Sequence, residues 1–363
     1  MSDIPRDAHR PEDPGPTAAP VVDRSSSRLA IPTPVLEQLE SHGLPVTGTL
    51  DAVEVKLQEQ VASSHAFVDE LARYLIGAGG KRFRPLMVAL TGHLGEGPSP
   101  RLVDAGVIVE LVHLATLYHD DVIDEAPARR GTPSANSRWD NTVAILTGDY
   151  LFARASELSA DLGVEVTRIM ARTLAELCEG QIAEVQGSLG ALPPDVPKLA
   201  PTREHYLEVI SGKTASLIAT SCRYGALLSG VDPDGVEAAA GYGWNVGMAF
   251  QLSDDILDIS SDPEDTGKTP GTDLREGVRT LPLLHALDQD PDGELAALLD
   301  GELSDAEVAR AIELLRSSDA LSRARDDASG YVSAAIGHLE PFDGSPVVKA
   351  LTRLAEYAVH RVG

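Results

Sequence analysis

The chain carries two copies of the pattern Asp-Asp-x-x-Asp, Asp120–Asp124 and Asp254–Asp258, more than a hundred residues apart. In a helix, acids at positions i and i+4 share one face, and the acid at i+1 lies beside them. Both copies are embedded in apolar sequence, where carboxylates are costly unless a positive charge meets them. Carboxylate oxygens suit Mg²⁺, which commonly shares its coordination with substrate phosphates. The pattern predicts two Mg²⁺-binding motifs that face one diphosphate.

The alternative is that these acids are solvated surface charges, since the chain has 56 Asp and Glu residues. For a single copy that reading would be favoured. Two copies with identical spacing, each preceded by an amphipathic helical stretch, favour the metal site instead.

The cations of this acidic chain are placed in a way that suggests anion binding. The net charge is −26, and there are just six lysines. Three of them are flanked by Gly, Thr or Arg, and these are Lys81, Lys213 and Lys268. Lys81 follows a Gly-Gly turn at an expected helix start, where free backbone N–H groups also attract anions.

Other polar residues stand at regular positions around the two motifs. They are Arg84 near Lys81, His113 two turns before Asp120, Arg129 and Arg130 after the first motif, Thr214 after Lys213, and Gln251 just before Asp254. Each alone has a plainer interpretation, as a surface pair, a core histidine or a polar neighbour. Their joint order relative to both motifs favours a diphosphate-binding site.

Helical periodicity dominates the segments that must position these residues. It covers 35–44, 50–76, 101–124, 143–162, 166–187, 204–230, 235–259, 281–289, 305–339 and 345–363. Loops are expected at 95–100, 187–201 and about 260–279, and no alternating strand pattern is evident. The pattern predicts an all-α fold, a single large antiparallel helical bundle over residues 31–363. Residues 1–30 are rich in Pro, Ser and charge, and are expected to be disordered.

Composition excludes several classes of protein. Hydrophobic residues make up 43% and aromatic residues 4%, so the core must consist mainly of Ala, Leu and Val. No apolar run is long enough for a transmembrane span, and the N-terminus lacks the apolar region of a signal peptide. Two cysteines make a disulfide framework unlikely and indicate a cytoplasmic protein. The negative charge argues against a nucleic-acid partner.

The sequence resembles the all-trans isoprenyl diphosphate synthase, or polyprenyl synthetase, family from about residue 35 to the C-terminus. The segments that carry the resemblance are GGKRFRP, HDDVIDEAPARRG, GKT, FQLSDDILD and GKTPGTDLREG. The resemblance implies a homodimer of helical subunits, with an active site inside each bundle. It also implies a Mg²⁺-dependent condensation of isopentenyl diphosphate with an allylic diphosphate, with three Mg²⁺ ions per site.

The family pattern carries over onto individual residues. It implies that Asp120, Asp121 and Asp124 are metal ligands for the allylic diphosphate, and that Asp254, Asp255 and Asp258 hold metal on the opposite side. Isopentenyl diphosphate would meet Lys81, Arg84, His113 and Arg130. The allylic diphosphate would meet Arg129, Lys213, Thr214, Gln251 and Lys268, with Lys213 and Lys268 also serving catalysis.

Product length depends, in this family, on side chains that precede the first motif by four, five and eight positions. Here these are Thr116, Ala115 and Val112, and none is aromatic. An open channel predicts a product beyond C20, in the range C30 to C50. A shorter product, as made by a geranylgeranyl or farnesyl diphosphate synthase, is the alternative.

Two other readings compete with a prenyl synthase. A class I terpene cyclase shares the first motif, but the second Asp-Asp-x-x-Asp and GGKRFRP argue against it. A non-catalytic subunit of a heteromeric synthase would be expected to lose one motif or the basic residues, and this chain keeps both.

Overall fold

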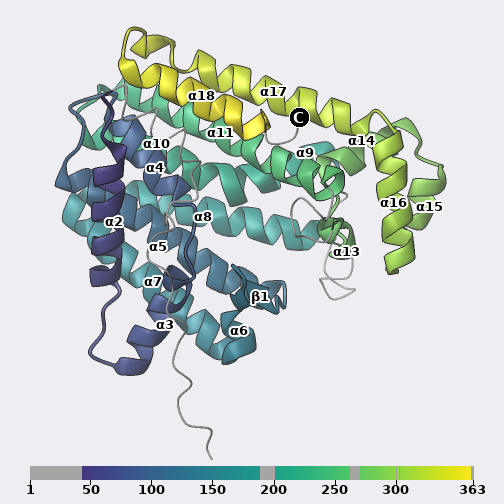
Figure 1. Ribbon diagram of the computed structural model, residues 1–363, viewed down its shortest axis with the longest axis horizontal. Coiled ribbons are helices and arrows are strands. Elements are labelled where there is room, and N and C mark those ends of the chain that lie inside the picture. The colour runs from purple at the N-terminus through teal and green to yellow at the C-terminus, as the bar shows by residue number, and fades with distance from the viewer. Residues whose placement is uncertain (1–42, 189–200, 262–269, 300, 302, 361–363) are drawn as a thin grey trace, which may run out of the picture.

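The computed structural model describes residues 43–188, 201–261, 270–299, 301 and 303–360. Over these residues the chain is almost entirely helical, and Figure 1 shows long helices packed side by side. The all-α class predicted from the sequence is confirmed. The expected N-terminal tail, nearly all of the expected helix at 35–44, and Lys268 lie outside the described residues.

Most of the described elements follow one another through short connections. In chain order they are α2 (Val46–Gln60), α3 (Ala66–Gly77), α4 (Phe83–Gly92), α5 (Pro100–Ile123), β1 (Ala128–Arg129), β2 (Thr132–Pro133), α6 (Ala135–Arg138), α7 (Asn141–Leu162), α8 (Val164–Gly187), α9 (Arg203–Ile210), the π-helix η1 (Ser211–Ala215), α10 (Ser216–Leu228), α11 (Pro233–Ser260), α13 (Thr272–Arg275), α14 (Leu281–Gln289), α15 (Glu294–Leu298), α16 (Asp305–Ser317), α17 (Ala320–Gly337), the 3₁₀-helix η2 (Glu340–Phe342) and α18 (Pro346–His360).

Helix α5 is the central helix of the bundle and packs against α2, α4, α7 and α10. It begins with Pro100 behind the N-cap Ser99, whose side chain accepts a hydrogen bond from the backbone N–H of Leu102. Its residues are buried around the whole circumference, as is typical of a helix surrounded by others. Among the described helices, α5 alone has the length and apolarity of a membrane span, but most of it is buried inside the protein.

Helix α11 is the second long core helix and packs against α10, α17 and α18 (Figure 1). Asp232 caps its N-terminus by accepting a 3.0 Å hydrogen bond from the backbone N–H of Gly235. Both α5 and α11 carry their Asp-Asp-x-x-Asp motif in the last turns. Because the C-terminal end of a helix repels anions, six carboxylates at two such ends require cations nearby.

Small residues let the helices approach closely in a core with few aromatic side chains. A Cβ atom on Gly212 would lie 2.7 Å from the carbonyl oxygen of Glu176 and 2.9 Å from the Cα of Gly180. The short π-helix η1 therefore lies directly against α8. Such an irregular turn inside a helical segment often marks a functional site, and this one carries Lys213 and Thr214.

The structure corrects three expectations about the elements. The stretch 50–76 is two helices, α2 and α3. The sequence indicated one continuous helix because the apolar periodicity continues across the corner at residues 61–65. The stretch 305–339 likewise divides into α16 and α17. After the first motif the chain forms a two-stranded antiparallel hairpin, β1 and β2, which is too short to show an alternating pattern.

Candidate active site

Lys213 and Asp255 of the second motif line one cavity, and Lys213 lies within electrostatic reach of Asp120 and Asp124 of the first motif. Glu276, which follows α13, connects the two motifs: burial raises the pKa of its carboxyl, and the carboxylates of Asp124 and Asp258 raise it further. One side chain therefore lies within electrostatic reach of both motifs. The facing arrangement expected from the sequence stays a prediction.

In the first motif, Asp121 differs from its neighbours. Its side chain is fully buried, and Oδ1 accepts a 2.6 Å hydrogen bond from Nε of Arg129 in the hairpin. Burial raises the pKa of Asp120 to about 6, against the opposing effect of Lys213, and burial also raises the pKa of Asp124. Asp120 and Asp124 thus form a partly buried acidic pair beside a cation, while Asp121 is paired within the protein.

In the second motif, Asp255 and Asp258 are each held by hydrogen bonds. The carboxylate of Asp255 accepts from the hydroxyl of Tyr206 and, at 2.9 Å, from Nε2 of Gln251. Asp258 accepts from the backbone N–H groups of Thr272 and Asp273, at 3.1 and 3.3 Å. Asp254 lies in the same turn of α11.

Lys213 lies between the motifs on the π-helix. Its Nζ donates to the carboxylate of Glu184 on α8. Burial alone would lower the pKa of Lys213, but the carboxylates of Glu184, Asp120 and Asp124 outweigh burial and raise it. The lysine is therefore firmly cationic, within electrostatic reach of Asp120 and Asp124.

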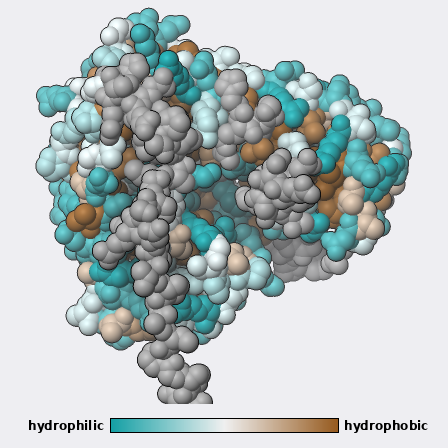
Figure 2. Space-filling view, viewed as in Figure 1, coloured by the Kyte–Doolittle hydropathy of each residue, from teal (hydrophilic) through white to brown (hydrophobic). Residues whose placement is uncertain are grey.

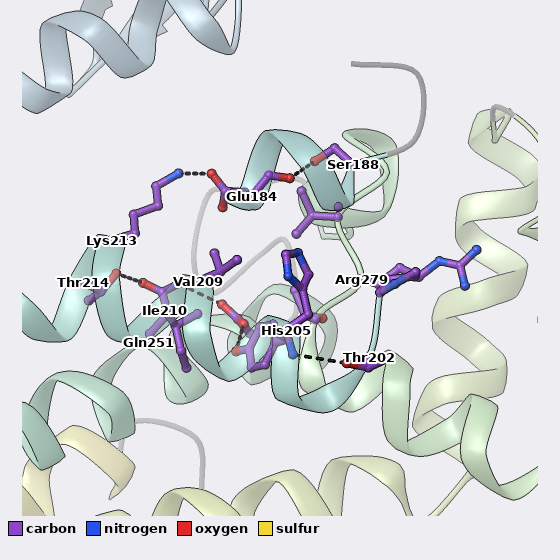
Figure 3. A pocket seen from close by; sticks show the side chains of 16 residues that line it. Glu184, Ser188, Thr202, His205, Val209, Ile210, Lys213, Thr214, Gln251 and Arg279 are labelled. Carbon is purple, nitrogen blue, oxygen red and sulfur yellow. Dashed lines mark hydrogen bonds and ion pairs between the residues drawn. The ribbon is translucent and has the colours of Figure 1, made fainter. Parts of the chain in front are cut away.

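A chain of hydrogen bonds continues from the π-helix to the second motif. Oγ1 of Thr214 donates to Oε1 of Gln251 at 2.9 Å, and Nε2 of Gln251 donates to Asp255. Figure 3 shows Lys213, Thr214 and Gln251 along one side of a cavity of about 110 Å³, with His205 and Thr202 on the other. The face of the molecule in Figure 2 is mainly hydrophilic, in keeping with the net charge of −26.

Cationic side chains gather where α4, α5 and the hairpin meet, and we call this cluster the basic pocket. Burial lowers the pKa of Arg84 to about 10, and its buried Nε has no hydrogen-bond partner among the described residues. Nη1 of Arg130 donates to the carbonyl oxygens of Leu75, at 3.1 Å, and Gly79. Burial, then the charges of Arg84 and Arg130, keep the pKa of His113 well below its usual range. Lys81 lies exposed at the edge, so the pocket gathers the expected cations around a neutral histidine.

The residues expected to set product length lie one to two turns before the first motif on α5. Val112 and Ala115 are fully buried, and Thr116 is half-buried with its hydroxyl bonded to the carbonyl oxygen of His113. Tyr118 points to another side of the helix, since its hydroxyl donates to the carbonyl oxygen of Leu71 on α3 at 2.6 Å. The hydroxyl of Tyr118 is therefore directed to α3, while its ring belongs to the same buried cluster as Val112 and Ala115.

Several acidic and polar residues of the site were not singled out from the sequence. Asp273 and Glu276 follow the second motif within GTDLREG, and that spacing could have revealed them. Glu184 and Tyr206 lie in helices with ordinary amphipathic patterns, so nothing in their local sequence marks them. Glu110 also went unnoticed, although a lone acid inside an apolar helix is a signal of a buried ion pair.

The comparisons with known proteins agree with this geometry. The family model described as polyprenyl synthetase matches residues 65–315. The chain is 45% identical over 315 residues to a nonaprenyl diphosphate synthase of Mycobacterium tuberculosis, covering 86% of this chain and 92% of that one.

Two solved structures extend the comparison to the fold. A decaprenyl diphosphate synthase from Rhodobacter capsulatus superposes with a TM-score of 0.81 at 34% identity, over 91% of this chain and 99% of that one. A geranylgeranyl pyrophosphate synthase from Corynebacterium glutamicum, complexed with calcium and isoprenyl diphosphate, superposes with a TM-score of 0.75 at 42% identity, over 88% and 96%. The match over most of the chain, in sequence and in fold, shows that this protein belongs to the polyprenyl synthetase family.

Proposed function

We propose that the protein is a Mg²⁺-dependent trans-prenyltransferase that condenses isopentenyl diphosphate with an allylic diphosphate and releases a long all-trans polyprenyl diphosphate. The observation that carries the proposal is the position of Lys213, which lines a cavity together with Asp255 of the second motif and lies within electrostatic reach of Asp120 and Asp124 of the first. The printed names of the relatives, nonaprenyl and decaprenyl diphosphate synthase, support a long product.

The donor set suits a hard divalent cation. It consists of carboxylate oxygens, and burial raises the pKa of Asp120 and Asp124, so these side chains lack sufficient positive charge around them. Mg²⁺ prefers such oxygen ligands together with phosphate oxygens. We assign Asp120 and Asp124 to metal on one side, and Asp254, Asp255 and Asp258 to metal on the other, with Asp121 orienting the first group. Bound there, three Mg²⁺ ions would neutralise the allylic diphosphate and make it a better leaving group.

The cationic and polar residues of the chain would hold the allylic diphosphate. Lys213 supplies a fixed positive charge. The hydroxyl of Thr214 and the amide of Gln251, which are bonded to each other in the structure, would turn to the diphosphate and donate hydrogen bonds to it. Arg129 and Lys268 would complete the set. Such preorganised charge stabilises the diphosphate as the C–O bond breaks.

The basic pocket would hold isopentenyl diphosphate. Arg84 offers a buried, unpartnered Nε, and Arg130 and Lys81 add positive charge beside it. His113 is neutral, so it would donate a hydrogen bond without adding charge. The double bond of isopentenyl diphosphate would attack the allylic cation, and the released diphosphate would accept the proton that is then lost.

The product would leave the site along α5, past Thr116, Ala115 and Val112. We propose a length between C30 and C50. The Corynebacterium relative, named a geranylgeranyl pyrophosphate synthase, supports a second candidate, a C20 product. Because Val112 and Ala115 are fully buried, neighbouring side chains would have to shift to admit a longer chain.

We also propose that the protein is a cytoplasmic homodimer. Large apolar side chains are exposed on α7 and α8, and these are Ile145, Leu146, Val164 and Ile182. A second copy of the chain would remove this surface from water. We expect no nucleic acid and no stable membrane insertion.

The test is to incubate the purified protein with labelled isopentenyl diphosphate and an allylic diphosphate, with Mg²⁺ or with a chelator. Elongated product is expected only when both substrates and the metal are present. Asp254→Asn should abolish it without unfolding the protein. No product with any starter, from folded protein, would overturn the proposal and favour a non-catalytic subunit.

A further inference from the structure

Arg82 is the most completely bonded arginine near the basic pocket. Its side chain is 3% exposed and lies between α2, α3 and α5. It pairs with Glu54 on α2, through Nε and Nη2, and Nη1 donates to Glu110 on α5 at 2.8 Å. Nη2 also lies 3.4 Å from the carbonyl oxygen of Ile76, near the end of α3. With its nitrogens engaged, Arg82 is not placed to bind a diphosphate.

The backbone of Arg82 has an unusual conformation. It is the N-cap of α4 and has φ +48° and ψ +35°, in the left-handed region that non-glycine residues rarely adopt. The surrounding ion pairs must compensate for this strain. The side chain therefore fixes the backbone immediately between Lys81 and the first turn of α4, which carries Arg84.

Arg82 also lies against Arg130 across Gly80. A Cβ atom on Gly80 would be 2.8 Å from Nη1 of Arg82 and 2.9 Å from Nη1 of Arg130. Two guanidinium groups thus pack on the same glycine, which only a residue without a side chain allows. A movement of the Arg82 guanidinium group would therefore also displace the guanidinium group of Arg130.

Glu110 is the anion that these arginines share. Its side chain is 2% exposed and hydrogen-bonds to Arg82, and its charge also acts on Arg84 and Arg130. Arg82 occupies the carboxylate of Glu110, while Nε of Arg84 has no hydrogen-bond partner among the described residues and Nη1 of Arg130 donates only to backbone carbonyl oxygens. Without Arg82, a buried and unpaired Glu110 would draw these two arginines toward itself.

We propose that Arg82 and Glu110 are positioning residues for the isopentenyl diphosphate pocket: the ion pair holds the loop from Gly79 to Arg84 in shape and keeps Arg84 and Arg130 available for the diphosphate. This inference rests on the proposed function, because it names which residues prepare the pocket assigned there to isopentenyl diphosphate.

The experiment measures KM for each substrate separately in Arg82→Lys, Arg82→Met and Glu110→Gln. Arg82→Met should raise KM for isopentenyl diphosphate at least about tenfold, as loss of a supporting residue typically does, and leave KM for the allylic diphosphate within about twofold. Arg82→Lys should have a smaller effect in the same direction, because one ammonium cannot engage both carboxylates.

Arg73→Met is the matched control. Arg73 on α3 pairs with Asp69 and with Gln58 of α2, and so makes a similar interhelical contact away from the pocket. It should change neither KM. Thermal unfolding of every variant shows that the protein measured is folded, and if Arg82→Met does not fold, Arg82→Lys and Glu110→Gln carry the test.

The double variant Arg82→Met/Glu110→Gln tests whether the effect acts through Glu110. We expect KM for isopentenyl diphosphate within about threefold of that of Glu110→Gln alone, because the fully buried carboxylate is then absent and the remaining one, Glu54, is 18% exposed to solvent. Fully additive effects, equal increases in both KM values, or an unchanged KM in folded Arg82→Met would each overturn the inference. Absence of turnover in the wild type and in Arg73→Met would instead overturn the proposed function.

Discussion

Arg129 and Asp121 form an ion pair in which Nε of the arginine lies 2.6 Å from Oδ1 of the fully buried aspartate. The hairpin that follows the first motif thereby attaches to the middle acid of that motif. Nδ2 of Asn136 strengthens the attachment with a 2.9 Å hydrogen bond to the backbone carbonyl of Asp121. The three aspartates of this motif are therefore not equivalent: one is held by the protein, and two face Lys213.

The first prediction follows from this inequality. Asp120→Asn and Asp124→Asn should each lower kcat on the order of 10³-fold, because each removes a carboxylate that would hold the metal ions at the leaving diphosphate. Asp121→Asn should lower it less, by about 10- to 100-fold, as is typical of a residue that orients others. Steady-state kinetics at saturating Mg²⁺ measure the difference. Equal losses in all three variants would contradict the separate role of Asp121.

The sequence predicted much of this site because its chemistry is concentrated in short motifs. The spacing of Asp120 and Asp124 on one helix is a local property, and so is the occurrence of Lys213 and Thr214 together. The ion pair of Lys213 with Glu184, and that of Arg82 with Glu54 and Glu110, join helices far apart in the chain. No local pattern encodes such tertiary contacts. Lys268 and the expected tail lie outside the described residues, so those expectations remain predictions.

The second prediction concerns pH and His113. Burial, then the charges of Arg84 and Arg130, hold the pKa of His113 in the folded protein well below 6.5. The unfolded chain therefore binds more protons below about pH 6.5, and the folded state loses stability as pH falls through that range. His113→Gln should remove this contribution. Unfolding midpoints from pH 8 to 5 should fall more for the wild type than for His113→Gln, and parallel curves would show that His113 is not held neutral.

The third prediction concerns product length. Ala115→Phe should shorten the product by one or more isoprene units, because the ring would fill space beside the first motif on α5. Overpacking would also lower stability by about 1–3 kcal/mol. Chromatography of the products by chain length measures the effect.

Tyr118→Phe provides the control on the same helix. It removes the hydroxyl that donates to Leu71 and accepts from the backbone N–H of Leu75, at a cost of about 1 kcal/mol, but keeps the ring. The product distribution should stay that of the wild type. If Ala115→Phe also left it unchanged, the channel would not run past Ala115.

The fourth prediction concerns the packing of α4 on α10. A Cβ atom on Gly225 would lie 2.5 Å from the carbonyl oxygen of Val88 and would also meet the side chain of Thr91. Gly225→Ala should therefore lower the free energy of unfolding by about 1–3 kcal/mol. Gly330→Ala, on the exposed side of α17 with nothing within 4 Å, should raise it by about 0.5–1 kcal/mol. Chemical denaturation measures both, and equal effects would contradict the close helix contact.

The most direct measurement is the chain length of the product. The protein should be incubated with labelled isopentenyl diphosphate, Mg²⁺ and, in turn, the C5, C10, C15 and C20 allylic diphosphates. A ladder that continues past C20 and ends between C30 and C50 is the predicted result. Arrest at C15 or C20 with every starter would contradict the long-chain assignment and show that side chains near Val112 and Ala115 close the channel.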